Sequence, residues 1–201
     1  MEKFIEHTGL VAPLDRVNVD TDQIIPKQFL KRIERTGFGQ FAFYDWRYLE
    51  DGVPNPEFIL NNPKFDGASI LVAGPNFGSG SSREHAPWAL SDFGIKCIIS
   101  SSFADIFYNN CFKNGILPII LDEEKIKELA EYSKRKEEIE IDLKEEKILF
   151  GNNELKFKID PFKKKCLIEG LDDIALSLEK SSHINEFEKK VKSARPWIFN
   201  D

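Results

Sequence analysis

The chain has 201 residues, enough to bury a substantial core, and we expect a single domain spanning residues 1–201. Acidic residues outnumber basic ones by 34 to 28, and the net charge of -6 argues against a protein that wraps nucleic acid with concentrated positive charge. The first residues lack the apolar core of a signal peptide, and no segment approaches the roughly 20 apolar residues of a membrane span. We therefore expect a cytoplasmic protein.

The N-terminal third carries few periodic segments and many polar groups. Residues 18–23, Asn-Val-Asp-Thr-Asp-Gln, combine carboxylates, amides and a hydroxyl, a composition typical of a turn that hydrogen-bonds its own backbone. Residues 35–47 are rich in aromatic side chains and glycine, and they are too irregular to predict a helix. We interpret this second stretch as a lid or a buried loop.

Three apolar runs in the middle of the chain have the length and branching of buried strands: 69–73, 97–100 and 116–121. Helical patterns alternate with these runs: about 84–93, 103–115 and 123–135. We expect Ser102 to cap the second helix and Asp122 to cap the third, while Gly94 and Gly115 end the first two. The alternation of strands and helices predicts an α/β fold with a mainly parallel central sheet flanked by helices.

The pattern changes after Glu138, where apolar residues alternate with charged ones and turn signals separate three short runs. This part predicts a short antiparallel meander. Asp160 and Pro161 then provide the start of a helix and Gly170 its end, before two further helical stretches. We expect a helical extension over about 160–201.

The turn at residues 78–85, Gly-Ser-Gly-Ser-Ser-Arg-Glu-His, follows the first of these strands directly. Ser81 and Glu84 have the spacing of a capping box, which predicts a helix N-terminus here. Glycine allows a ligand to approach the backbone closely, so N–H groups from Gly80 to Ser82 could stabilise negative charge. Arg83 adds a planar pair of donors suited to a carboxylate or a phosphate. The turn therefore predicts a site for a small anionic substrate.

Other chemistries are weaker at this turn. Ser81 and His85 lie one helical turn apart, but the surrounding residues are not the Gly-x-Ser-x-Gly elbow of a serine hydrolase. The glycines match no nucleotide-binding loop either. The cysteines and histidines are scattered and contain no Cys-x-x-Cys pair, so we expect this chain to bind no metal by itself.

Three segments carry a family resemblance: 18–26, 78–90, and 101–111 with Asn-Gly-Ile-Leu-Pro at 114–118. Together they resemble the swivelling domain of the aconitase superfamily, and within it the small-subunit family of 3-isopropylmalate dehydratase. The resemblance implies a β/β/α swivelling domain and a separate large subunit that carries a [4Fe-4S] cluster. It implies a hydro-lyase that interconverts 2-isopropylmalate and 3-isopropylmalate in leucine biosynthesis and is active only with the large subunit.

Residue roles follow from the same resemblance. Ser81 matches the catalytic serine base. The neighbouring Ser82 and Arg83 match substrate-binding residues, and Thr21 and Asp22 match the other polar edge of the site. The cluster in the large subunit would bind the substrate hydroxyl and a carboxylate, so this chain would supply the proton acceptor.

Substrate choice stays open at this stage. A related hydro-lyase acting on a citramalate-, dimethylmalate- or homoaconitate-type diacid would share every catalytic residue, and a regulatory RNA-binding relative is a less favoured alternative. We expect the loop 31–44 to contact the isopropyl group through Ile33, Phe38, Phe41 and Phe43. Arg32, Arg35 and Arg47 are candidates for holding the second carboxylate.

Overall fold

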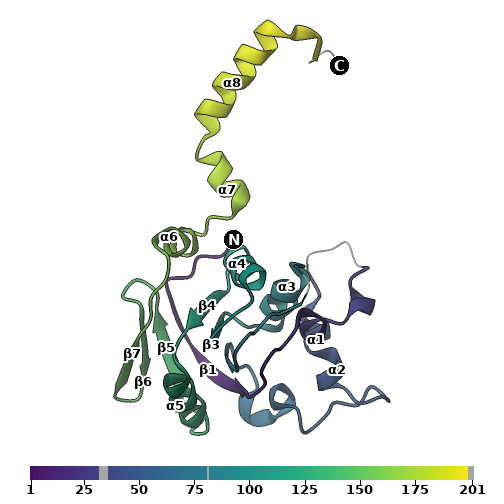
Figure 1. Cartoon of the computed structure of the whole chain (residues 1–201), viewed down its shortest axis with the longest axis vertical. Coiled ribbons are helices and arrows are strands. Elements are labelled where there is room, and N and C mark those ends of the chain that lie inside the picture. The colour runs from purple at the N-terminus through teal and green to yellow at the C-terminus, as the bar shows by residue number, and fades with distance from the viewer. Residues whose placement is uncertain (32–35, 81, 199–201) are drawn as a thin grey trace.

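The computed structural model describes residues 1–31, 36–80 and 82–198, and within these residues one seven-stranded sheet is flanked by helices (Figure 1). The strand order is β4-β3-β2-β1-β5-β6-β7. The strands are β1 (Glu6–Leu14), β2 (Ile70–Ala73), β3 (Cys97–Ser100), β4 (Leu117–Ile120), β5 (Glu138–Asp142), β6 (Lys147–Phe150) and β7 (Asn153–Lys156). The helices are α1 (Thr21–Ile24), α2 (Tyr44–Arg47), α3 (His85–Phe93), α4 (Asp105–Lys113), α5 (Glu123–Ser133), α6 (Pro161–Glu169), α7 (Asp173–Leu178) and α8 (Ser181–Ala194).

Strand β1 joins a parallel half of the sheet to an antiparallel half, and the sequence patterns did not predict it. Its residues 11–14 pair with β2 in parallel, and its residues 6–10 pair with β5 in the antiparallel sense. Gly9 and Pro13 are weak strand formers, and they interrupt the apolar pattern of a segment whose C-terminal half is buried. The central strand of the sheet is therefore not recognisable from its composition.

The parallel half confirms the predicted α/β winding, because β2, β3 and β4 run parallel in chain order. Their side chains alternate between two buried clusters. Leu71 and Ile98 belong to the cluster that includes Leu90 of α3, whereas Ile70 and Ile99 belong to the one that includes Leu129 of α5. Helices thus cover both faces of the parallel strands, which keeps the sheet away from water.

The predicted ends of these helices are confirmed, and so is one of the predicted starts. Gly94 forms the C-cap of α3 with a φ of 109°, and Gly115 follows the end of α4 with a φ of 74°. Asp122 caps α5 by accepting a hydrogen bond from the backbone N–H of Lys125 at 3.0 Å. The glycines and the aspartate therefore act as the capping rules predict.

The predicted start of α4 at Ser102 is wrong. The helix begins at Asp105, and the residue before it, Ala104, makes no side-chain capping bond. The Ser102 hydroxyl instead accepts a hydrogen bond from the backbone N–H of Asn76 at 2.8 Å. Ser102 is thus used to hold the loop that follows β2.

The predicted capping box at Ser81 and Glu84 is also wrong, because α3 begins only at His85 with Glu84 in the N-cap position and no side-chain cap. A capping box occurs instead at the start of α1. There the side chain of Asp20 accepts from the backbone N–H of Gln23 at 2.8 Å, and the Gln23 side chain accepts from the backbone N–H of Asp20 at 2.9 Å. Ser82 and Arg83 therefore precede the helix rather than form its first turn.

The C-terminal part follows the prediction. Strands β5, β6 and β7 form an antiparallel meander, and α6 begins after Asp160, whose carboxylate accepts from the backbone N–H groups of Phe162 and Lys163. Gly170 ends α6 with a φ of 74°. Helices α7 and α8 then lead away from the sheet (Figure 1). Among the described residues, no helix has the length and apolar character needed to cross a membrane.

Candidate active site

The loops that follow β1 and β2 lie side by side at one edge of the sheet. The backbone N–H of Gly78 donates to the carbonyl of Val19 at 2.7 Å, and the N–H of Thr21 donates to the carbonyl of Ser79 at 2.8 Å. Asp20 and Ser79 form a parallel bridge. The carboxyl ends of parallel strands meet at the same edge, and ligands of α/β sheets bind there. Two of the three family segments therefore meet here.

The third segment joins them through the loop that follows β3. Phe77 and Phe103 form a parallel bridge, in which the N–H of Phe77 donates to the carbonyl of Ser102 at 3.1 Å and the N–H of Ala104 donates to the carbonyl of Phe77 at 3.0 Å. Phe77 is fully buried. The three segments that carry the resemblance thus form one connected structure, although they are far apart in the chain.

The glycines of this turn are required by its shape. A Cβ at Gly78 would lie 2.1 Å from Cγ of Phe107, and the backbone there has a φ of +79°. A Cβ at Gly80 would lie 3.3 Å from Oγ1 of Thr21, at a φ of +94°. Both φ values belong to the left-handed region that only glycine adopts without strain. The turn therefore packs tightly against α4 on one side and α1 on the other.

Charged side chains from the two loops meet beside Gly80. The carboxylate of Asp22 lies 3.4 Å from Nη1 of Arg83 and 3.0 Å from Nζ of Lys27. The side chains of Arg83 and Asp22 are 36% and 37% exposed, so both remain accessible to a ligand. The guanidinium of Arg83 is therefore an accessible positive charge beside the glycine turn, and it is suited to bind a carboxylate or a phosphate.

The predicted site residues that are described surround this turn. Thr21 is buried at the start of α1, whereas Gly80 and Ser82 are exposed. The carbonyl of Ser82 accepts a hydrogen bond from the side-chain amide of Asn110 at 3.3 Å. Ser81, the predicted base, lies outside the described residues. Five of the six predicted residues are therefore brought together by the fold: Thr21, Asp22, Gly80, Ser82 and Arg83.

Two residues that contact predicted site residues were not singled out from the sequence. Lys27 follows the motif that contains Asp22, and its ion pair with Asp22 could not be recognised from composition. Asn110 lies in the quoted motif 101–111, but only the fold shows that it holds the Ser82 carbonyl. The available signal was the placement of both residues within or next to a family segment.

His85 does not complete a hydrolytic triad. Its Nδ1 is buried and has no hydrogen-bond partner among the described residues, so no carboxylate orients the ring as a triad requires. The ring packs edge-on against Phe38 and lies 4.8 Å from the ring of Trp88. Burial, together with the nearby charge of Arg83, lowers the pKa of His85 below 6.5. The lowered pKa favours the neutral form of His85, so the positive charge of the turn comes from Arg83.

The loop 31–44 was predicted to form an apolar wall for the substrate, but its described aromatic residues do not form one. Phe38 and Phe43 are fully buried in the core, so neither side chain faces a ligand. Phe41 is half-buried and stacks on Phe29 with ring centres 4.1 Å apart. Ile33 lies outside the described residues. Residues 35–47 were interpreted as a lid or a buried loop. Burial of the aromatic rings favours the buried loop.

Arg47 serves to hold this loop together. Its guanidinium donates to the carbonyls of Gly39 and Ala42, each at 3.4 Å, and lies 4.7 Å above the ring of Phe93. Phe93 is the last residue of α3, while Arg83 precedes the first. Arg47 is therefore engaged at the far end of α3 and is a poor candidate for the second carboxylate. Arg32 and Arg35 lie outside the described residues.

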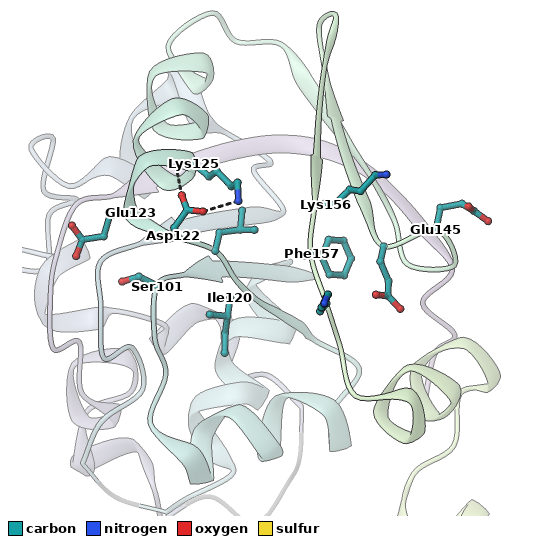
Figure 2. A pocket seen from close by; sticks show the side chains of 11 residues that line it. Ser101, Ile120, Asp122, Glu123, Lys125, Glu145, Lys156 and Phe157 are labelled. Atoms are coloured by element: carbon teal, nitrogen blue, oxygen red, sulfur yellow. Dashed lines mark hydrogen bonds and ion pairs between the residues drawn. The ribbon is translucent and has the colours of Figure 1, made fainter.

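A surface pocket lies elsewhere, away from this turn. It has a volume of about 840 Å³ and lies between the end of β4 and the region of the meander, as Figure 2 shows. Ile120 and Phe157 form its apolar part, and Lys125 pairs with Asp122 at 2.6 Å on one side. No predicted site residue lines this cavity. The candidate site is thus an open, charged turn at the surface of this chain.

The thiols of this chain do not fit an iron–sulfur cluster. Cys97 and Cys111 are fully buried, and burial raises the pKa of each thiol well above its usual value, which disfavours the thiolate that binds iron. Among the described residues, no group of three His, Cys, Asp or Glu side chains could hold a metal ion.

Comparisons with known proteins agree with this geometry. Residues 1–124 match the model of the aconitase C-terminal domain, and residues 173–201 match the C-terminal domain of the 3-isopropylmalate dehydratase small subunit. A crystal structure of 3-isopropylmalate dehydratase from Methanocaldococcus jannaschii is 28% identical with a TM-score of 0.66, covering 92% of this chain and 99% of its own. The predicted fold class is thereby confirmed.

Curated relatives match over nearly the whole chain. The 3-isopropylmalate dehydratase small subunit of Pelagibacter ubique is 67% identical over 100% of this chain and 99% of its own length. The small subunit of Sinorhizobium fredii is 56% identical over 98% of this chain and all of its own. With the three motif segments meeting at one turn, these matches show that the chain belongs to the 3-isopropylmalate dehydratase small-subunit family, within the aconitase superfamily.

Proposed function

We propose that this chain is the small subunit of a hydro-lyase that interconverts 2-isopropylmalate and 3-isopropylmalate in leucine biosynthesis. The observation that carries the proposal is the meeting of Asp22 and Arg83 beside the glycine turn, in a chain that matches small subunits over nearly its full length. The residues 1–201 would then act as one swivelling domain with a C-terminal helical extension. A large subunit, which carries the [4Fe-4S] cluster, is its partner in this proposal.

In this proposal Arg83 binds a substrate carboxylate, and Ser81 removes a proton from the carbon next to the one that bears the hydroxyl. Loss of that proton and of the hydroxyl, as water, gives an unsaturated diacid. Addition of water with the hydroxyl on the neighbouring carbon completes the isomerisation. Thr21, Ser82 and the backbone of Gly80 would hold the substrate during both halves of the reaction.

The electrostatics of the turn support a serine base. A hydroxyl has a pKa far above neutrality, so an alkoxide needs nearby positive charge and hydrogen-bond donors. Arg83 supplies a positive charge that Asp22 holds in place. The side chains of Arg83 and Asp22 are more than a third exposed in this chain, which supports a site completed by a second subunit.

Turnover of 2-isopropylmalate tests the proposed function. This chain, mixed anaerobically with a cluster-loaded large subunit, is expected to form the unsaturated diacid, which is followed by its ultraviolet absorbance, whereas either chain alone is expected to be inactive. Turnover only with a citramalate-, dimethylmalate- or homoaconitate-type diacid would show that the proposed substrate is wrong. Turnover by this chain alone would overturn the shared site.

Arg83→Gln is expected to lower kcat/KM of the assembled enzyme about 10- to 100-fold, mainly through KM, because a hydrogen bond to a charged group contributes about 1.5–3 kcal/mol. Lys27→Gln is the matched control, since it removes the other cation that contacts Asp22 from a side chain that is 70% exposed. We expect the control to change kcat/KM less than about threefold. Equal losses in both variants would show that general charge, not Arg83, binds the substrate.

A further inference from the structure

The C-terminal arm, which we define as residues 173–198, presents an apolar stripe that nothing in the structure covers. Apolar residues recur on α8 at spacings of three and four, which places them on one face: Ile184, Phe187, Val191 and Ala194. Neither α7 nor α8 contains a buried residue. Figure 1 shows both helices extending away from the body. An amphipathic helix normally buries such a stripe.

The exposure of the stripe continues along the whole arm. Phe187 is 66% exposed, and Trp197, just beyond α8, is 68% exposed. On α7, Ile174 and Leu178 lie four residues apart and are 70% and 63% exposed. Large apolar side chains gathered in this way mark an interaction surface rather than ordinary surface scatter. A helix of 14 residues is also marginal in water without a packing partner.

The base of the arm is held to the body. The N-terminal amine of Met1 donates to the carbonyl of Gly170 at 3.1 Å and lies 3.5 Å from the carboxylate of Asp172. Lys113 at the end of α4 pairs with Asp173 at 2.8 Å. These contacts fix where the arm leaves the body, at the end of α4 that points away from the glycine turn. The stripe is therefore separate from the proposed catalytic residues.

We propose that the arm is a docking element for the large subunit, with the stripe of α8 as its contact face. The proposal rests on the proposed function for the existence of that partner. The family model that matches residues 1–124 is that of a C-terminal domain, which in its namesake is part of a longer chain. The model that matches residues 173–201 is specific to the small subunit. The arm is thus found where the domain is a chain of its own. Such a chain needs a non-covalent contact with the large subunit in place of the peptide link of the longer chain.

A second copy of this chain fits the stripe less well. Ile184, Phe187, Val191, Ala194 and Ile198 have heptad spacing, but they span about two heptads. A two-stranded coiled coil requires about three to four heptads. Ala194 would also leave one of the contact layers poorly filled. A larger partner surface, which can contact α7, α8 and Trp197 together, buries more of the stripe.

Binding of full-length variants to the cluster-loaded large subunit tests this proposal, by calorimetric titration under anaerobic conditions. The variant Ile184→Gln with Phe187→Gln is expected to raise Kd about tenfold or more, because it removes two exposed apolar anchors. Lys189→Gln, on the opposite face of α8, is the matched control and is expected to stay within about twofold. Circular dichroism of each free chain checks that the fold is unchanged.

Activity separates this proposal from the proposed function. The stripe variant is expected to need more large subunit for half-maximal turnover but to reach the wild-type rate when the large subunit is in excess. Arg83→Gln is expected to bind the large subunit with the wild-type Kd but to have a lower kcat/KM for the substrate. An unchanged Kd in the stripe variant would overturn the docking role, and so would a wild-type chain that does not bind the large subunit. If the wild-type chain self-associates and the stripe variant does not, the partner of the stripe is a second copy of this chain rather than the large subunit. A pair that binds through the stripe but does not convert 2-isopropylmalate would refute only the proposed function.

Discussion

Ser81→Ala is expected to lower turnover of 2-isopropylmalate by the assembled enzyme about 10²–10⁴-fold, the range that a positioned general base contributes. The reason is chemical, because no other group proposed for this chain accepts the substrate proton. Arg83 is a permanent cation and Asp22 is engaged by Arg83 and Lys27. Burial lowers the pKa of His85 and favours its neutral form, but its ring is packed among the aromatic side chains of Phe38 and Trp88.

Steady-state kinetics of the assembled pair measure this effect, and light scattering checks that the subunits still associate. Ser79→Ala is the matched control, since Ser79 lies in the same turn and its hydroxyl makes a long contact, of 3.5 Å, with the carbonyl of Asn18. We expect this control to retain activity within about threefold. If Ser81→Ala keeps more than about a tenth of the turnover while Ser79→Ala is normal, the base must be another group.

The fold was predictable wherever the residues carried a strong local pattern. The strands β2, β3 and β4 are short, mainly apolar and mostly buried runs, and Gly94, Asp122 and Gly170 mark helix ends through their own conformation or side chain. Strand β1 was missed because its pairing in the sheet, not its composition, makes it a strand. Tertiary context decided that element.

The site was predictable in its residues but not in its geometry. The resemblance named Thr21, Asp22 and Arg83, yet no periodicity could show that the two loops pair through the backbone of Ser79. The helix start also could not be read from spacing. A serine and a glutamate three residues apart match a capping box, but here the glutamate is itself the N-cap residue and α3 begins only at His85.

The aromatic loop shows the same limit for specificity. Apolar side chains after the Asp22 segment are compatible with either a substrate wall or a core, and sequence alone does not distinguish them. Phe38 and Phe43 are core residues because α3 and the 3₁₀ turn at Gly39–Phe41 pack against each other, with the backbone N–H of Phe38 bound by Asp92 at 2.9 Å. A contact with the isopropyl group must then come from other residues of the loop or from the large subunit.

Gly78→Ala is expected to destabilise the free chain by about 2–5 kcal/mol, because a left-handed backbone costs about 1–2 kcal/mol for alanine and overpacking adds about 1–3 kcal/mol. The new methyl group would meet Phe107 at 2.1 Å, and neither the ring nor the adjoining Cβ, at 2.5 Å, can move freely in the core. Gly52→Ala is the matched control, since its φ of +78° is nearly identical and no atom lies within 4 Å of the added Cβ. It is expected to cost only the backbone part, about 1–2 kcal/mol.

Urea unfolding of the two variants separates the cost of the contact with Phe107 from the cost of the left-handed backbone. Equal losses in the free energy of unfolding would contradict the close packing of the turn against Phe107.

The substitution at Gly78 is also expected to affect catalysis. Relief of the collision must move the turn away from α4 and weaken the bond from Gly78 to the Val19 carbonyl, which keeps the Arg83 and Asp22 loops together. Gly78→Ala should therefore lower both stability and turnover, whereas Ser81→Ala should lower turnover alone. That contrast distinguishes the residues that hold the turn in place from the residue that performs the chemistry.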